Sequence, residues 1–209
     1  NAWKYDIDGG TEISAGGMTY LVSQALHKEN TDLAWIAVVS ALGDRQDQGE
    51  KKSFLGINLE IAAAAKKNNQ VEIDLDILLV GRETRSLPDA LAFTSQPFIE
   101  GITWNRDACL SLLNSSGIKL KDGSRWRVPA ELTEDEKRIL LQSISKFTSS
   151  KNATEIMDEL VGYTYTLSGE DKRSFLRDAR EFSTMLNSCG RIRKAGVGIA
   201  ICMGDRTKM

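Results

Sequence analysis

Apolar residues recur at helical spacing along the first third of the chain and predict three helices. Ser14 can cap the first helix, and Thr31 can cap a second that is apolar on nearly every side through Leu42. Such a helix must be buried on most sides, and it ends at Gly43. A third helix is expected from Ser53 to Lys67. The first helix carries its apolar face on Met18, Leu21, Val22, Ala25 and Leu26.

The pattern changes after residue 70, where strands become more frequent. Residues 71–80 predict one or two strands, residues 121–128 a hairpin around Asp122-Gly123, and residues 163–167 a further strand. Thr133 with Glu136 predicts a capping box. Further helices are expected at 105–113, 155–161 and 175–186, a linker at 148–152 and a final strand at 197–203. The fold class is therefore α/β with helices dominant.

Composition and charge narrow the classes of function. The 209 residues are 41% hydrophobic and carry a formal net charge of −2, which argues against strong non-specific binding to DNA. No apolar run approaches the length of a membrane span, so we expect no membrane association and a cytoplasmic location. Cys109, Cys189 and Cys202 are far apart and form no CxxC pair, which favours buried thiols over zinc ligands or disulfides.

Few residues offer catalytic chemistry. His27 is the single histidine, and its position late in an amphipathic helix favours a solvated or helix-capping role over a Ser-His-Asp triad. The glycine pairs at 9–10 and 16–17 match neither a P-loop nor a dinucleotide fingerprint.

The most informative carboxylate is Asp44, which follows directly on the glycine that ends the buried helix. A charged group at the end of such an element is costly unless something pairs with it, and a divalent metal would pair with it well. The residues alone favour the alternative, in which Asp44 and Asp47 begin a solvated loop, because structural carboxylates outnumber metal ligands.

Several stretches resemble archaeal RecJ-like single-strand exonucleases of the DHH phosphoesterase family. They are IDGGTEISAGG (7–17), ALGDRQD (41–47), LRDAREF (176–182), MLNSCGR (185–191) and GVGIA (196–200). The likeness covers most of the chain, although residues 100–160 match only loosely. It implies an interior piece of a longer protein, because the family's Asp-His-His motif would lie upstream of Asn1 and its Gly-Gly-His-type motif beyond Met209.

The resemblance implies three parts. Residues 1–80 would be the C-terminal part of a DHH phosphoesterase domain, 81–165 a mainly helical connecting or inserted segment, and 166–209 the N-terminal part of a DHHA1-type α/β domain. We expect Trp104 and Trp126 to pack inside the middle segment rather than to touch DNA.

The resemblance also implies a site. Asp44 matches the family's final aspartate, so it would be a catalytic carboxylate and a ligand in a two-metal site for Mn²⁺ or Mg²⁺. Asn187, Gly190 and Arg191 would contact the substrate, with Arg191 on a phosphate. The alternative for Arg191 is a last-turn charge that complements the helix dipole. One carboxylate cannot hold two metals, so we expect this stretch alone to be inactive.

Two functions follow as expectations. The first is part of a metal-dependent exonuclease that hydrolyses phosphodiester bonds in single-stranded DNA, or RNA, during replication or repair. The second is a non-catalytic scaffold in which residues 81–165 dock a GINS-type replication complex. A helical scaffold unrelated to nucleic acid fits the match at residues 176–191 poorly.

Overall fold

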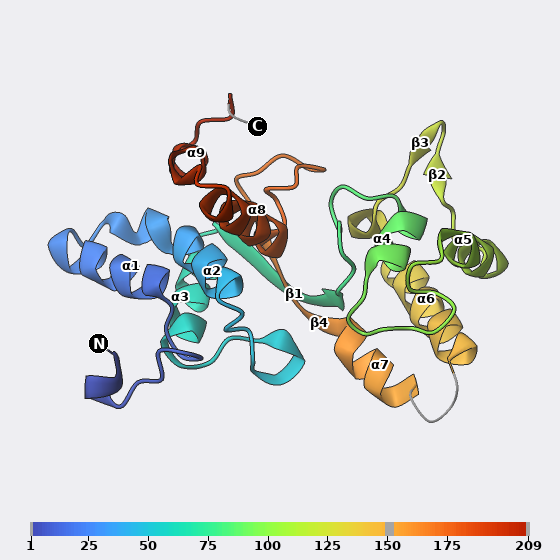
Figure 1. Ribbon diagram of the computed structural model, residues 1–209, viewed down its shortest axis with the longest axis horizontal. Helices are drawn as coiled ribbons and strands as arrows, with labels where there is room; N and C mark the ends of the chain where they lie inside the picture. Colours follow the sequence, from blue (N-terminus) through green and yellow to red (C-terminus); the bar gives the residue numbers. More distant parts are fainter. Residues whose placement is uncertain (1, 149–152, 208–209) are drawn as a thin grey trace. The chain divides into compact units, whose positions relative to one another are not determined.

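The computed structural model describes residues 2–148 and 153–207, and they divide into two compact units. Unit 1 comprises Asn1–Asp74, Tyr165–Asp171 and Leu176–Met209, and unit 2 comprises Leu75–Thr164 and Lys172–Phe175. The chain passes from unit 1 to unit 2 within strand β1 (Val71–Ile77) and returns within β4 (Val161–Leu167) (Figure 1). The predicted linker at 148–152 falls almost wholly outside the described residues.

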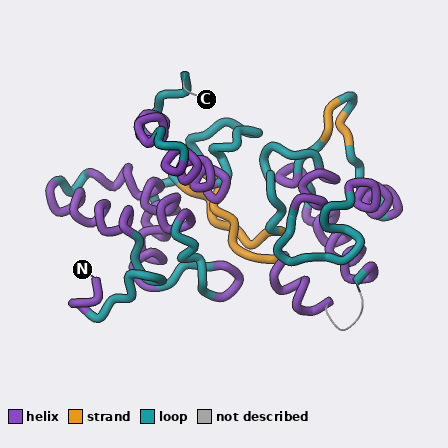
Figure 2. Tube along the Cα trace, viewed as in Figure 1, coloured by secondary structure: helices purple, strands orange, loops and turns teal. Residues whose placement is uncertain are grey.

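Strands β1 and β4 form a two-stranded sheet. The N–H of Leu78 donates to the carbonyl of Leu160 at 2.7 Å, and at the other end the N–H of Ser168 donates to the carbonyl of Gln70 at 2.9 Å. These bonds join residues whose numbers rise on one strand and fall on the other, so the strands run antiparallel. The hairpin of β2 (Lys121–Asp122) and β3 (Arg125–Trp126) is the second small sheet, and helices fill most of the remainder (Figure 2).

Unit 1 is a helical body around the buried helix α2. Glycine at position 16 lets α1 approach α2 closely, since a Cβ there would lie 2.4 Å from the Cβ of Ser40. Trp35 of α2 stacks on Phe182 of α8 with ring centroids 5.8 Å apart. The helices are α1 (Ala15–Leu26), α2 (Ala34–Gly43), α3 (Gly56–Lys67), α8 (Ala179–Arg191) and α9 (Ala195–Cys202), with short 3-10 turns η1 (Ala2–Tyr5), η2 (Asn30–Leu33) and η3 (Glu50–Lys52).

Unit 2 has its own core, built from the inner faces of four helices. Leu91, Leu113, Ile144 and Leu160 are among its fully buried members, one from each helix. Burial of such side chains stabilises a fold by about 1.5–3 kcal/mol each. The helices are α4 (Leu87–Phe93), α5 (Arg106–Ser115), α6 (Glu134–Phe147) and α7 (Ala153–Leu160), with a 3-10 turn η4 (Pro129–Glu131).

Local signals in the sequence predicted several helix starts correctly. The hydroxyl of Ser14 accepts from the N–H of Gly17 at 3.0 Å, and Thr133 with Glu136 forms the expected capping box of α6. His27 is the exposed C-cap of α1, which confirms the capping role. The hairpin at residues 121–128 is also confirmed, with Gly123 at a φ of 62° in its turn.

Three predictions from the pattern were wrong. The apolar run at 197–203 is the helix α9, because a short run of apolar residues has no period that separates a strand from a buried helix. Thr31 does not cap α2, because η2 precedes that helix and its N-cap is Leu33. Trp104 is 65% exposed, so it does not pack inside unit 2.

The predicted boundaries at residues 80 and 165 can be compared with the two compact units. Most residues of the first and last predicted parts lie together in unit 1. Their assignment to DHH and DHHA1 domains stays a prediction. The described structure is mainly helical with two small sheets, and no described helix is long and apolar enough to cross a membrane.

Candidate functional site

The exposed carboxylate of Asp44 stands at the end of the most buried helix of unit 1. Six of the ten residues of α2 are buried, and Asp44 is its C-cap, with its N–H donating to the carbonyl of Ser40 at 3.1 Å. The side chain itself is exposed, and no hydrogen bond or ion pair ties it to another described residue. A rigid helix therefore presents an unpaired negative charge.

The loop after Asp44 is fixed by a buried polar network. Gln46 is 3% exposed, and its amide nitrogen donates to the carbonyl of Gly9 at 3.0 Å. Its amide oxygen accepts from the Nδ2 of Asn58 at 2.6 Å, and the Oδ1 of Asn58 accepts from the N–H of Ser14 at 3.2 Å. A satisfied buried network of this kind stabilises one arrangement, because breaking any member leaves a partner unpaired. The network holds the 9–14 segment, α3 and the loop after α2 in one register.

Asp47 has a different role from Asp44. Its Oδ2 lies 2.8 Å from an Nη of Arg180, and the guanidinium of Arg180 stacks over the ring of Tyr165 at 5.3 Å. This partly buried ion pair joins the loop after α2 to the start of α8. Of the two carboxylates in the ALGDRQD stretch, only Asp44 keeps a carboxylate without an ion pair.

Helix α8 brings Asn187 to the end of α2. The Nδ2 of Asn187 donates to the carbonyl of Gly43 at 3.2 Å. A Cβ at Gly43 would lie 3.6 Å from both Asn187 and Ser183, which is ordinary van der Waals contact, so α8 packs against α2 at this point without requiring glycine. Two residues predicted from the sequence, Asp44 and Asn187, are thus brought together across 143 positions of the chain.

Gly190 and Arg191 occupy the last turn of α8. Both are exposed, and a Cβ at Gly190 would meet nothing within 4 Å. The side chain of Arg191 makes no hydrogen bond or ion pair with another described residue. Its place in the last turn of the helix also satisfies the dipole interpretation, so the substrate-binding role of both residues stays a prediction.

The described residues do not fit a two-metal centre by themselves. Nowhere in residues 2–148 and 153–207 do three His, Cys, Asp or Glu side chains gather closely enough to hold a metal ion. At the end of α2 there is one available carboxylate, since Arg180 occupies Asp47. A site for Mn²⁺ or Mg²⁺ at Asp44 would need further oxygen ligands from elsewhere.

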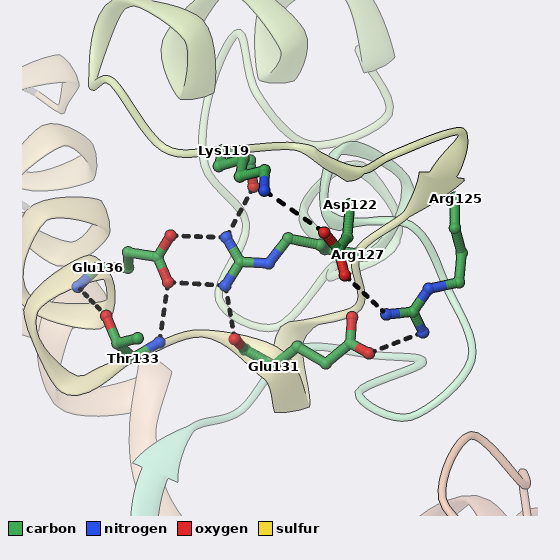
Figure 3. Close-up of a pocket in the computed structure, with 7 residues that line it drawn as sticks. All are labelled: Lys119, Asp122, Arg125, Arg127, Glu131, Thr133 and Glu136. Carbon is green, nitrogen blue, oxygen red and sulfur yellow. Dashed lines mark hydrogen bonds and ion pairs between the residues drawn. The ribbon is translucent and has the colours of Figure 1, made fainter.

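Unit 2 contains a charged cavity of about 410 Å³ between the β2–β3 hairpin and α6 (Figure 3). Arg127 is at its centre and binds Glu136 through both guanidinium nitrogens, at 2.6 and 2.7 Å. The same guanidinium donates to the carbonyls of Lys119 and Glu131. The hydrogen-bonded Arg127 holds the pKa of Glu136 at about 2, and Glu136 raises the pKa of Arg127.

Glu131 closes the other side of this cavity. Arg173 binds both of its carboxylate oxygens, at 3.1 and 2.8 Å, and also donates to the carbonyl of Trp126. This hydrogen bonding lowers the pKa of Glu131 to about 2. The cavity's remaining charges pair as well, with Lys119 on Asp122 at 3.4 Å and Arg125 on Glu131 at 2.9 Å.

Every charged side chain that lines the cavity therefore has an opposite charge beside it. Three cations face three carboxylates, so no net charge is left to attract an ionic ligand. We interpret the cluster as a clasp that fixes the hairpin to α6. Sequence reasoning found Thr133 and Glu136 from their capping spacing but missed Arg127 and Arg173, because no local pattern marks an ion-pair partner 9 or 42 positions away.

Comparison with known proteins relates the chain to one family through unit 2. Residues 79–161 match the family described as the DHH-CID domain, and these residues fall within the main segment of unit 2. The chain is also 29% identical over 205 residues to an uncharacterised protein of Methanocaldococcus jannaschii. That alignment covers 98% of this chain and 41% of the relative, so the chain spans about two-fifths of its relative's length. Residues 79–161 are thus similar to the DHH-CID domain, an insertion domain of the DHH family.

Proposed function

We propose that this chain is part of a metal-dependent phosphodiesterase that removes nucleotides from an end of single-stranded DNA or RNA. Two observations support the proposal. The DHH-CID match relates the chain to a phosphoesterase family. The exposed Asp44, without an ion-pair partner among the described residues, then carries it, since a preorganised oxygen ligand is what a hard cation requires.

Asp44 would supply one ligand to a Mn²⁺ or Mg²⁺ site whose other ligands come from outside the 209 residues. In such sites the metal ions activate water and neutralise charge on the phosphate. Within this chain, Asn187 positions the Asp44 segment through its bond to the carbonyl of Gly43, and the Gln46 network keeps the loop from moving. Gly190 and Arg191 lie one turn further along α8, where Arg191 could bind a substrate phosphate.

The decisive experiment uses the longer protein that contains these residues. We expect Asp44→Asn to reduce manganese-dependent digestion of a 5′-labelled or 3′-labelled single strand by at least about 100-fold, because a lost metal ligand removes charge stabilisation from the reaction. Glu60→Gln is the matched control, since Glu60 is exposed on α3 in the same unit. Circular dichroism should show the same fold for both variants. An unchanged rate for Asp44→Asn would remove Asp44 from the site.

The isolated 209-residue chain gives a second test. With one available carboxylate at the end of α2, it should not digest single strands when Mn²⁺ or Mg²⁺ is added. Robust metal-dependent digestion by this chain would contradict the proposal, because it would require a complete site within the described residues.

A non-catalytic scaffold is the second candidate, and the compactness of unit 2 favours it. Unit 2 has a separate core, and each charged side chain in its charged cavity is paired. Both features are expected of a module that can serve as a docking platform. In this case residues 81–165 would bind a GINS-type replication complex. Pull-down of that complex by the longer protein, with and without residues 81–165, tests the idea independently of nuclease activity.

A further inference from the structure

Unit 2 exposes three aromatic side chains in the segment that joins α4 to α5. Phe93 is 43%, Phe98 61% and Trp104 65% exposed. Phe93 and Trp104 are in contact, so these two rings form one exposed apolar patch, and such patches mark binding surfaces in soluble proteins. The charged cavity and the core of unit 2 make no use of these rings.

The backbone of Trp104 indicates that its exposed position is a maintained feature. Its φ is 67°, in the left-handed region that a bulky residue adopts only with backbone strain. Two contacts hold it there. Its N–H donates to the carbonyl of Ala92 at 2.8 Å, and its indole meets the ring of Phe93 at 86° with centroids 5.7 Å apart. These two contacts hold Trp104 in the strained conformation, in which 65% of the residue is exposed to solvent.

Cations lie directly against the neighbouring rings. The guanidinium of Arg85 is 4.6 Å from the centre of the Phe93 ring, and the ammonium of Lys121 is 4.4 Å from that of Trp126. Neither Arg85 nor Lys121 has an ion-pair partner among the described residues, and both are exposed. Both charges are exposed to an anionic ligand, and the Arg85 guanidinium also interacts electrostatically with Asp89.

Arg106 and Asp89 connect these two groups into one surface. The Nε of Arg106 lies 2.7 Å from Asp89, and the same guanidinium lies 5.6 Å from the centre of the Trp126 ring. Asp89 is one helical turn from Phe93 on α4. The aromatic–basic face of unit 2 is thus made of Arg85, Phe93, Trp104, Lys121 and Trp126, from α4, the residue before α5 and the β2–β3 hairpin.

We propose that this aromatic–basic face binds single-stranded nucleic acid, with a base stacked on Trp104 and phosphates on Arg85 and Lys121. Unpaired bases offer π faces that a duplex hides, and base–aromatic stacking tolerates any sequence. The chain's net charge of −2 means that phosphate contacts alone would hold a strand weakly, so stacking carries the interaction. The face lies in unit 2, so binding there does not depend on Asp44 or on a metal.

A protein partner is the rival occupant, because aromatic residues and arginine are also enriched in protein interfaces. Charged side chains are depleted from the centre of such interfaces. Here the two cations without ion-pair partners lie on Phe93 and Trp126, and Phe93 is in contact with Trp104, which suits a ligand that carries a phosphate beside every base. The observations therefore favour nucleic acid.

The test measures binding of the 209-residue chain to a fluorescein-labelled oligo-dT strand by fluorescence anisotropy, without divalent metal. We expect Trp104→Ala to weaken binding about tenfold or more. Trp3→Ala is the matched control, because Trp3 is 67% exposed in unit 1, and it should leave the affinity within about twofold. Trp104→Gly is the second variant, since glycine adopts the left-handed backbone without strain and keeps the loop folded.

Two further strands separate stacking from charge. An abasic strand of equal length should bind at least about tenfold more weakly than oligo-dT, and a blunt duplex should also bind more weakly. Arg85→Gln and Lys121→Gln should each reduce the salt dependence of binding by about one unit of slope. The proposal would be overturned if the wild-type chain bound the abasic strand as tightly as oligo-dT, or if the Trp104 variants bound oligo-dT as tightly as the wild-type chain. It would also be overturned if the wild-type chain showed no saturable binding. The proposal would also be overturned if a protein partner, and not a single strand, covered Trp104.

Discussion

The charged cavity of unit 2 and the end of α2 in unit 1 use their charged residues in opposite ways. In unit 2 the charges around Arg127 are all paired, and the result is a clasp with no charge left for a ligand. In unit 1 the buried Gln46 network and the Asp47–Arg180 pair fix a loop so that one carboxylate, on Asp44, stays exposed and without a described partner. Fully paired charges therefore have a structural role, whereas the carboxylate of Asp44 is the kind of group that the proposed metal site requires. The same criterion separates Arg85 and Lys121 from the charged cavity within unit 2.

The largest effect is expected from acid, which should weaken the ion pairs of the clasp. The folded-state pKa of both Glu131 and Glu136 is about 2, below the ordinary 4.5, so their stabilisation is present above pH 4.5 and is lost as the pH falls toward 2. Because both groups are partly exposed, we expect the free energy of unfolding to fall by about 4 kcal/mol over this range. Urea titrations at a series of pH values measure it. A Glu131→Gln, Glu136→Gln double variant should lose most of this pH dependence, and an unchanged slope would show that other groups cause it.

Arg127→Ala should have the next largest effect. It leaves the carboxylate of Glu136 without its bidentate partner and two backbone carbonyls without a donor. We expect a loss of about 3 kcal/mol, seen as faster amide hydrogen exchange in α6 and the hairpin but not in α1–α3. Arg138→Ala is the control, since the ion pair of Arg138 with Asp135 is exposed and contributes less than about 1 kcal/mol. Equal exchange in the two variants would show that the clasp is not a structural element.

Gly16→Ala should destabilise unit 1 by about 2 kcal/mol, because the new methyl group would overlap the Ser40 side chain and force α1 away from α2. Thermal unfolding followed by circular dichroism measures the change. Gly196→Ala is the matched control, since a Cβ at that position in α9 meets nothing within 4 Å. Increased stability of the Gly16 variant would mean that the two helices are packed less closely than described.

Asp44→Asn should have the smallest effect on stability, within about 0.5 kcal/mol, because the side chain is exposed and tied to no described residue. Asp47→Asn weakens the pair with Arg180 and should cost about 1 kcal/mol. Chemical denaturation of the two variants side by side sharpens the comparison between a structural and an available carboxylate. A larger loss for Asp44→Asn would show that Asp44 stabilises the fold.

Local signals explain what could be predicted from the sequence. The caps at Ser14 and Thr133 depend on residues three positions apart, and the hairpin depends on Asp122-Gly123, so all three were found. The helix α9 was missed because its apolar run has no distinctive period. In the candidate site, the place of Asp44 at the end of a buried helix was predicted from the pattern, whereas its role as a metal ligand is implied by the resemblance alone and stays a prediction. The partners Gln46–Asn58 and Asp47–Arg180 depend on tertiary packing, which a single sequence does not reveal.

Strands β1 and β4 also determine how unit 2 is attached. Since the chain leaves unit 1 along one strand and returns along its antiparallel neighbour, the two crossing points lie side by side. A short turn from Asp74 to Tyr165 would therefore suffice to excise most of unit 2 while keeping the remaining chain continuous. Such a minimal unit 1 would still carry the segment with Arg173, now without Glu131 to bind it. Evolution could lengthen, replace or lose this module through a two-strand stem without redesigning the helices that hold Asp44.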